Sequence, residues 1–205
     1  MVYKDEWWRL FSPIMLHAGV IHLVSNVFIQ LRVGGYLNLV FGTKRWLIIY
    51  ILSGVYGNMC SCCFLTDSIG VGSSGALLGI LTAWIVYIIF RWQKIPESLK
   101  MTRNCQLLVV LFAVGFTLSM SFTDLVDWAA HFGGSLQGLL WGVILLAHEL
   151  DNVNTRLYVR IIALLISICS FTYTIYYLIN IMNPDESIFT LSNANDDWNK
   201  YPHNG

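Results

Sequence analysis

Long apolar runs, separated by short connectors, constrain this chain more than any other feature of its sequence. A membrane-spanning helix needs about 20 consecutive apolar residues. Six runs approach or exceed that length: residues 10–33, 46–65, 74–92, 107–121, 128–147 and 159–182, the fourth being the shortest. Only 12% of the residues are charged, whereas soluble domains carry about 25%. The sequence therefore predicts an all-α polytopic membrane protein with six transmembrane helices in contact with the lipid bilayer.

No connector is long or polar enough to form a separate soluble domain. We expect residues 1–149 to form one helical core and residues 150–182 to add a linker and an extra C-terminal transmembrane helix. Residues 183–205 are polar and acidic, and we expect a disordered tail there. The first residues carry charged and aromatic side chains without the apolar core of a signal peptide. The net charge is zero, so nothing favours a nucleic-acid partner.

Basic residues are concentrated at alternate connectors, those that follow the first, third and fifth apolar runs. Nine of the twelve Lys and Arg residues lie there: Arg32, Lys44, Arg45, Arg91, Lys94, Lys100, Arg103, Arg156 and Arg160. The connectors at residues 66–73 and 122–127 contain aspartates and no basic residue. Because basic loops stay in the cytosol, we expect the N-terminal segment and the acidic tail to face the lumen or the outside.

A serine flanked by glycines, Ser74 in the sequence Gly-Val-Gly-Ser-Ser-Gly of residues 70–75, opens the third apolar run. One interpretation is helix packing, because small residues in apolar segments let helix backbones approach closely. The other is a nucleophile at a helix N-terminus, where unpaired backbone N–H groups can stabilise an oxyanion. The motif alone leaves both open, and packing is the commoner use.

Further polar residues favour the second interpretation. The first, third and fifth runs all enter the membrane from the non-cytosolic side, so His22 and Asn26, Ser74, and His131 share one depth. Polar groups at membrane depth are costly and usually functional. His131 is the candidate general base for Ser74. His22 and Asn26 are four residues apart, hence on one helical face, and can supplement the serine N–H as oxyanion donors.

For the serine and the histidine to meet, the third and fifth helices must approach closely. Both carry glycines at four-residue spacing, Gly75 and Gly79 in one helix and Gly134, Gly138 and Gly142 in the other. This pattern is typical of closely packed membrane helices. We therefore expect direct backbone contact between these two helices.

Other polar residues have simpler explanations. We interpret His17 as a packing residue and Asp127 as a loop residue or N-cap of the fifth helix, since capping is the common use of Asp before a helix. The five cysteines lack the paired spacing of a zinc site, so we interpret them as buried, unmodified thiols.

In combination, these motifs resemble the rhomboid intramembrane serine proteases, over roughly residues 8–147. Each motif is weak alone, but their order and topology are specific. The residues that carry the resemblance are Trp8-Arg9 with Phe11, His22-x-x-x-Asn26, Gly42-x-x-Arg45, Tyr50-x-x-x-Gly54-x-x-Gly57, Gly72-Ser73-Ser74-Gly75 and Asp127-x-x-Ala130-His131-x-Gly133-Gly134.

The resemblance implies a Ser74–His131 dyad without a third acid and an oxyanion hole from His22 and Asn26. It implies no metal and no cofactor. It also implies that the Trp8-Arg9 loop is half-embedded in the outer leaflet. Family substrates are single-pass membrane proteins, cleaved in or near the transmembrane segment. The alternative is a catalytically inactive relative that binds transmembrane segments for quality control or trafficking. A channel or transporter would show inverted repeats, which the sequence does not clearly contain.

Two features depart from the family pattern. Asn38 occupies a position where many members have glutamate. The family core also has a helix before the Trp-Arg loop, so we expect the chain to be N-terminally truncated. The run at residues 159–182 is instead an extra helix after the core, as in the eukaryotic secretory-pathway or cell-surface branch. We therefore expect a secretory-pathway or plasma-membrane protein with its active site toward the lumenal or extracellular side.

Overall fold

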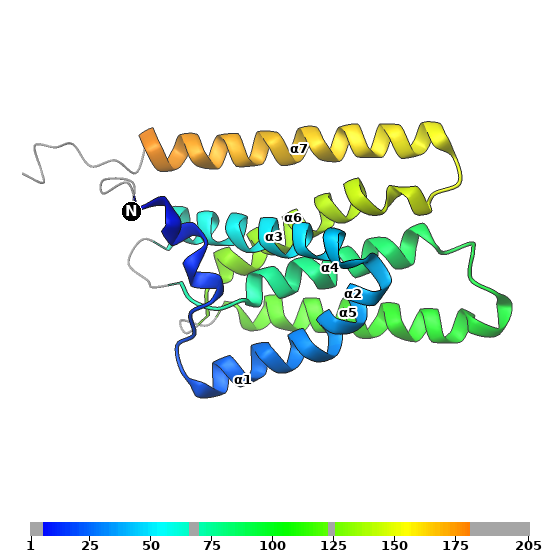
Figure 1. Cartoon of the computed structure of the whole chain (residues 1–205), viewed down its shortest axis with the longest axis horizontal. Helices are drawn as coiled ribbons and strands as arrows, with labels where there is room; N and C mark the ends of the chain where they lie inside the picture. Colours follow the sequence, from blue (N-terminus) through cyan, green and yellow to red (C-terminus); the bar gives the residue numbers. More distant parts are fainter. Residues whose placement is uncertain (1–5, 66–69, 123–125, 181–205) are drawn as a thin grey trace, which may run out of the picture.

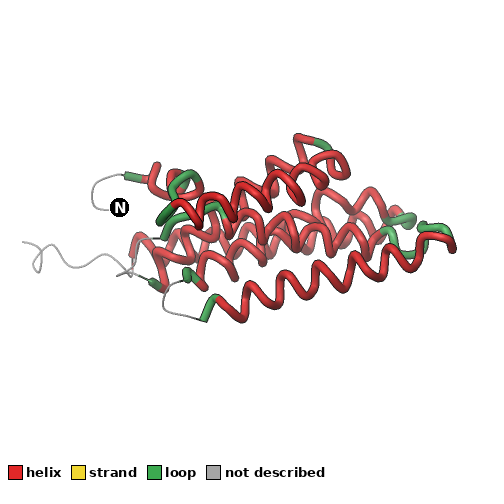
Figure 2. The backbone as a smooth tube through the Cα atoms, turned by 90° about the horizontal axis from the view of Figure 1, so that it is seen from below, coloured by secondary structure: helices red, strands yellow, loops and turns green. Residues whose placement is uncertain are grey.

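A computed structural model describes residues 6–65, 70–122 and 126–180, and all regular structure in these ranges is helical (Figure 2). This confirms the all-α prediction. The main helices are α1 (Val20–Ile29), α2 (Gly35–Phe41), α3 (Thr43–Phe64), α4 (Ser74–Phe90), α5 (Lys100–Met120), α6 (Trp128–Leu146) and α7 (Val153–Asn180). A π-helical turn, Gln30–Gly34, joins α1 to α2.

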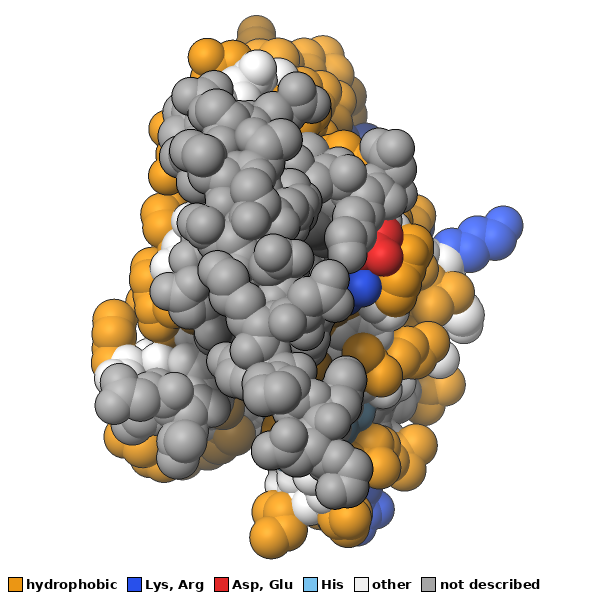
Figure 3. Space-filling view, turned by 90° about the vertical axis from the view of Figure 1, so that its left-hand side faces the viewer, with side chains coloured by type: hydrophobic (Ala, Val, Ile, Leu, Met, Phe, Trp, Pro, Cys, Tyr) orange, Lys and Arg blue, Asp and Glu red, His pale blue; other side chains and the backbone are white. Residues whose placement is uncertain are grey.

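The long helices lie side by side along one axis of the molecule (Figure 1). Helix α4 contacts α3, α5 and α6, and α7 packs against α6 and α3. Helices α1, α4 and α6 begin at the same end of the molecule, on the left of Figure 1, as their expected common topology requires. Apolar side chains cover the flanks visible from that end (Figure 3), as expected for helices that contact lipid.

Among the described residues, five helical segments are long and apolar enough to cross a membrane: Val20–Phe41, Thr43–Phe64, Glu97–Met120, Trp128–Glu149 and Val153–Asn180. The sixth, α4, is apolar but has only 17 residues. At about 1.5 Å per residue it extends roughly 26 Å, which is less than the hydrocarbon thickness of about 30 Å. A short α4 followed by the basic loop at Arg91 therefore leaves its first residue, Ser74, below the opposite membrane surface.

The prediction for the first apolar run placed both ends too early, because the helical segment of membrane length here covers Val20–Phe41. Residues 10–33 were expected to form one helix, but the chain makes two 3-10 turns, Trp7–Leu10 and Ser12–Ile14, and the α-helix begins at Val20. Pro13 stands at the start of the second turn, and Gly19 is extended just before the helix. Apolar composition does not distinguish such an embedded loop from a helix.

The fourth apolar run, at residues 107–121, is the shortest of the six, but the helix that contains it is longer than the run. Helix α5 has 21 residues and begins at Lys100, seven residues before the apolar run. Its first turns are polar, and Arg103 packs over the Trp92 ring and donates to the Trp92 carbonyl oxygen at 2.7 Å. A hydropathy pattern identifies only the apolar part of a helix, so the polar first turns of α5 were not predicted.

Glycines bring the α4 and α6 backbones into direct contact, as expected. A Cβ built on Gly134 would lie 2.2 Å from the Gly75 carbonyl oxygen, and one on Gly138 would lie 2.2 Å from the Gly79 oxygen. Helix α3 approaches α6 in the same way, because a Cβ on Gly57 would lie 2.6 Å from the Ala130 carbonyl oxygen. The three helices thus form a tightly packed centre.

Polar contacts attach the additional helix α7 to this centre. The buried side chain of Gln137 on α6 accepts from Ser167 at 2.9 Å and donates to Ser170 at 2.8 Å. Nearer the C-terminal end of α7, Thr174 donates to the Tyr56 hydroxyl at 3.3 Å. Because each of these polar groups has a hydrogen-bond partner, its burial at membrane depth costs little free energy.

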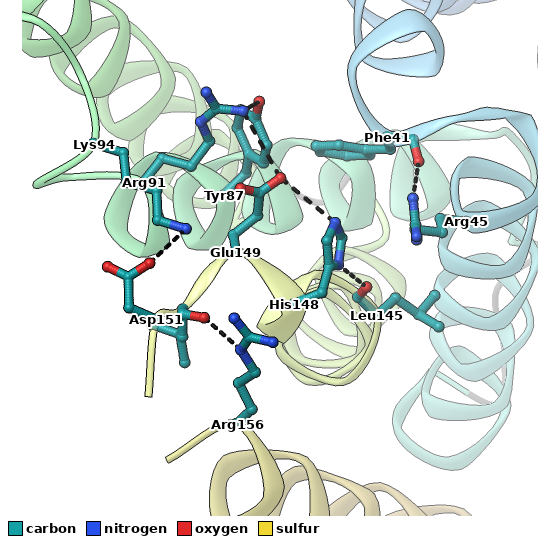
Figure 4. Close-up of polar contacts among 11 residues, drawn as sticks. Phe41, Arg45, Tyr87, Arg91, Lys94, Leu145, His148, Glu149, Asp151 and Arg156 are labelled. Carbon is teal, nitrogen blue, oxygen red and sulfur yellow. Dashed lines mark hydrogen bonds and ion pairs between the residues drawn. The ribbon is translucent and has the colours of Figure 1, made fainter. Parts of the chain in front are cut away.

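Ion pairs connect the loops at the opposite end of the bundle from Ser74 (Figure 4). Lys94 lies 2.9 Å from Asp151 and Arg91 lies 3.8 Å from Glu149, so the loop after α4 is joined to the loop after α6. These groups are partly exposed, and such pairs contribute little stability. Their main consequence is to place basic side chains at this end, as the orientation argument expects.

Adding a methyl group at Gly138 is expected to destabilise the bundle. Gly138→Ala forces the methyl against the α4 backbone, and overpacking of this kind costs about 1–3 kcal/mol, so the thermal unfolding midpoint in detergent should fall. Gly115→Ala on α5 is the matched control, since nothing lies within 4 Å of its Cβ position. Equal midpoints for the two variants would contradict the close approach of α4 and α6.

Candidate active site

The hydroxyl of Ser74 lies within hydrogen-bond distance of the His131 ring. Ser74 Oγ is 2.7 Å from His131 Nε2. Ser74 is the first residue of α4, and His131 lies in the first turn of α6, where only 5% of its surface is exposed. The close approach of the two helices brings together residues that are 57 positions apart in the sequence.

Gly72 shapes the loop that leads into Ser74. Its φ of +120° is a conformation that favours glycine, and a Cβ there would lie 2.7 Å from the His22 ring. Its N–H donates to the Pro13 carbonyl oxygen at 2.9 Å. Both the backbone angle and the space therefore require glycine two residues before the serine.

The N-terminal segment that supports this loop is itself fixed to α3. The amide of Asn58 donates to the Leu10 carbonyl oxygen at 2.8 Å. The Ile14 side chain fills the space above Gly54, whose Cβ would lie 2.6 Å from it. Trp8, by contrast, is 57% exposed. The segment of 3-10 turns is therefore a structural support of the loop at Ser74.

His22 and Asn26 both lie beside the loop that precedes Ser74. Asn26 is 5% exposed, and its Nδ2 donates to the His22 carbonyl oxygen at 3.0 Å and lies 3.7 Å from the Cβ position of Gly72. The side chain of Ser73, the N-cap of α4, makes no capping hydrogen bond, and the first backbone N–H groups of a helix have no partner within the helix. Their role as oxyanion donors stays a prediction.

The side chains of two neighbouring polar residues, His17 and Asp127, make other contacts than hydrogen bonds to the Ser74 and His131 side chains. The ring of His17 packs edge-on against His22, with centroids 5.2 Å apart. Asp127 accepts from the Ala130 N–H at 2.8 Å and so caps α6, which confirms the N-cap prediction.

At the other end of the bundle, the Oδ1 of Asn38 is buried without a hydrogen-bond partner in the described chain.

Sequence reasoning missed one residue of the site, Ser121. It follows α5 directly and is fully buried, with its Oγ 2.5 Å from Nδ1 of His131. The His131 ring is therefore held between two hydroxyls, those of Ser74 and Ser121. No motif surrounds Ser121, and its contact with the ring depends on where α5 ends relative to α6.

Nothing in the described part of the chain forms a group of three metal-binding side chains. The chemistry available at the site is that of a hydroxyl, an imidazole and backbone or amide N–H donors. Fold and site therefore define a helical multi-pass membrane protein with a buried serine–histidine pair near one end of the bundle.

Comparison with known proteins identifies the family to which this membrane protein belongs. Residues 4–148 match the Rhomboid domain family model, and the chain belongs to the rhomboid family. It is 40% identical over 146 residues to RHOMBOID-like protein 6, mitochondrial, of Arabidopsis thaliana, covering 71% of this chain and 46% of that protein. The chain spans about half the length of the first such relatives.

Two more distant relatives are named as proteases. Rhomboid-like protease 3 of Toxoplasma gondii is 33% identical over 134 residues, which is 65% of this chain and 50% of the relative. Rhomboid protease GluP of Bacillus subtilis is 30% identical over 138 residues, or 67% and 26%. The family assignment and these names support a protease. One relative is named mitochondrial, so the secretory-pathway location stays a prediction.

Replacing Asp127 distinguishes capping from catalysis. Asp127→Ala should lower the free energy of unfolding by about 0.5–2 kcal/mol, whereas Asp127→Asn keeps a capping oxygen and most of the stability. Activity of the folded Asn variant should stay close to that of the parent chain. A loss near 10⁴-fold in Asp127→Asn, the size seen when a triad aspartate becomes asparagine, would contradict the capping role.

Proposed function

We propose that this protein is an intramembrane serine endopeptidase that cleaves single-pass membrane proteins in or near their transmembrane segments. The observation that carries the proposal is the 2.7 Å contact between Ser74 Oγ and His131 Nε2 inside a membrane helix bundle. Membership of a family with protease-named relatives supports it. The proposed partners are transmembrane substrates and the surrounding lipid, with the site toward the lumenal or extracellular side.

In the first half of the proposed reaction, Ser74 Oγ attacks the carbonyl carbon of the scissile peptide bond. As the new C–O bond forms, the hydroxyl proton passes to His131 Nε2. The proton then passes from Nε2 to the amide nitrogen while the C–N bond breaks. An acyl-enzyme remains on Ser74, and the new amine terminus leaves.

Water completes the cycle by the same steps in reverse order. His131 takes a proton from a water molecule, the hydroxide attacks the acyl carbon, and the proton returns to Ser74 Oγ as the ester bond breaks. The short α4 favours this step, because a helix of 17 residues is shorter than the hydrocarbon layer and its first residue, Ser74, lies at one end of the bundle.

Negative charge develops on the carbonyl oxygen in both halves. The free N–H groups at the start of α4 and the side chains of His22 and Asn26 are the proposed donors. His22 lies against Gly72, and Asn26 is buried next to it. These groups are already ordered by the loop, so little reorganisation accompanies the reaction.

Labelling with a fluorophosphonate probe tests the nucleophile without a known substrate. The detergent-solubilised chain should react at Ser74, and Ser74→Ala should abolish labelling because Ser74 carries the hydroxyl that lies against His131 Nε2. His131→Ala should reduce labelling to background for the same reason. Ser73→Ala, one residue away, is the matched control and should still be labelled.

Retained labelling in Ser74→Ala would contradict the assignment of the nucleophile. Equal circular dichroism spectra of the variants show that they fold. A folded chain that neither labels nor cleaves a transmembrane substrate in liposomes would favour the alternative, a non-catalytic relative that binds transmembrane segments.

Asn26→Ala is expected to lower the cleavage rate of a model transmembrane substrate by up to about 10²–10³, the usual effect of losing one oxyanion donor. Ser25→Ala is the matched control. Ser25 bonds to the carbonyl four residues earlier, as Asn26 does, but its side chain is exposed. A comparable loss in both variants would indicate a general effect on α1.

A further inference from the structure

The ring of His131 has a second partner, which the proposed serine–histidine mechanism does not use. Ser121 Oγ lies 2.5 Å from Nδ1, on the side of the ring opposite Ser74. The same Oγ lies 2.6 Å from the Thr117 carbonyl oxygen, one turn back along α5. A line of polar atoms thus runs from Ser74 through the imidazole and Ser121 to the backbone of α5.

The position of the Ser121 proton follows from these contacts. A serine hydroxyl has one proton to donate, and a carbonyl oxygen can only accept. Two oxygens 2.6 Å apart repel unless a proton lies between them, so the Ser121 hydroxyl donates to Thr117. Its lone pairs then face His131, and the 2.5 Å contact requires that Nδ1 carry the ring proton.

We infer that Ser121 is a positioning residue that holds neutral His131 as its Nδ1–H tautomer, with the lone pair on Nε2 aimed at Ser74. This inference rests on the proposed function, since only a base needs Nε2 bare. With the other tautomer, Nε2 would carry the proton and could not accept that of Ser74. Ser121 therefore acts through His131 and does not itself touch the substrate.

The surroundings of Ser121 argue for this role over simple packing. Helix α5 is largely exposed, and only Arg103, Val110 and Val114 of its residues are buried. Ser121, directly after the helix, is nevertheless 0% exposed. Its burial comes from contact with the start of α6, and a polar group buried in this way requires hydrogen-bond partners.

A neutral hydroxyl also suits the reaction that we propose. When Nε2 receives the Ser74 proton, the ring becomes an imidazolium, and its Nδ1–H continues to donate to Ser121. The proton of Ser121 remains on the Thr117 bond throughout, so no further proton transfer is needed. The hydroxyl stabilises the cation as a dipole and fixes the plane of the ring.

Nuclear magnetic resonance tests the tautomer directly, and the result does not depend on proteolytic activity. The full chain is labelled with ¹⁵N-histidine and measured in detergent at about pH 8, where an imidazole is neutral. Comparison with His131→Ala assigns the His131 signals, and couplings between ring protons and nitrogens identify the protonated nitrogen. We expect Nδ1–H in the wild-type chain and a loss of this preference in Ser121→Ala.

Kinetics provide the second measurement. Ser121→Ala should slow fluorophosphonate labelling about tenfold, the effect of one ordinary hydrogen bond, while Ser121→Thr keeps the hydroxyl and should restore most of the rate. Ser119→Ala is the matched control, because Ser119 makes the same bond to a carbonyl four residues earlier but is exposed. Its rate should not change.

Three results would overturn the inference: a wild-type His131 protonated at Nε2, an unchanged tautomer in Ser121→Ala, or equal labelling rates in Ser121→Ala and wild type. The wild-type spectrum decides the first even if Ser121→Ala does not fold. If the wild-type chain is not labelled at all, the proposed protease function fails, and the spectra still decide whether Ser121 selects the tautomer.

Discussion

The direct contact between the backbones of α4 and α6 is the interaction on which the site depends. Gly134 lies against Gly75, and Gly138 lies against Gly79. A Cβ at Gly134 or Gly138 would lie 2.2 Å from a backbone oxygen of α4, so the two helices would have to move apart. The 2.7 Å contact between Ser74 and His131 therefore depends on the absence of a Cβ at these glycines. In a lipid environment, where the hydrophobic effect does not drive helices together, such close packing supplies much of the stability.

The same packing explains how polar residues are tolerated at this depth. Three polar side chains of the site have hydrogen-bond partners: His131 lies between the hydroxyls of Ser74 and Ser121, Asn26 donates to the His22 carbonyl oxygen within α1, and Asp127 accepts from the Ala130 N–H at the start of α6. Burial of a polar group is costly only when the group lacks a partner. The contacts of His131 with Ser74 and Ser121 join α4, α6 and the residue that follows α5.

Much of this arrangement could be predicted from the sequence, because Ser74, His131 and the glycines each carry a local signal. Spacing of four residues marks a helix face, and alternate basic loops set the direction of each helix. These two rules were enough to predict that Ser74 and His131 lie at the same depth in the bundle. They could not locate the start of the first helix, because an embedded loop of 3-10 turns is as apolar as a helix and is fixed by distant contacts such as that of Asn58 with Leu10.

Ser121 shows the limit of such reasoning most clearly. A serine at the end of an apolar run is ordinary, and its importance arises from the angle at which α5 meets α6. Its chemistry is nevertheless suited to the membrane. A carboxylate in contact with Nδ1 would stabilise the imidazolium more strongly, but it would carry a buried charge through every part of the cycle in which His131 is neutral, at a cost of several kcal/mol. A hydroxyl bonded to a backbone carbonyl orients the same ring without any net charge. A dipole in place of an acid is therefore the less costly way to prepare a histidine base inside a lipid bilayer.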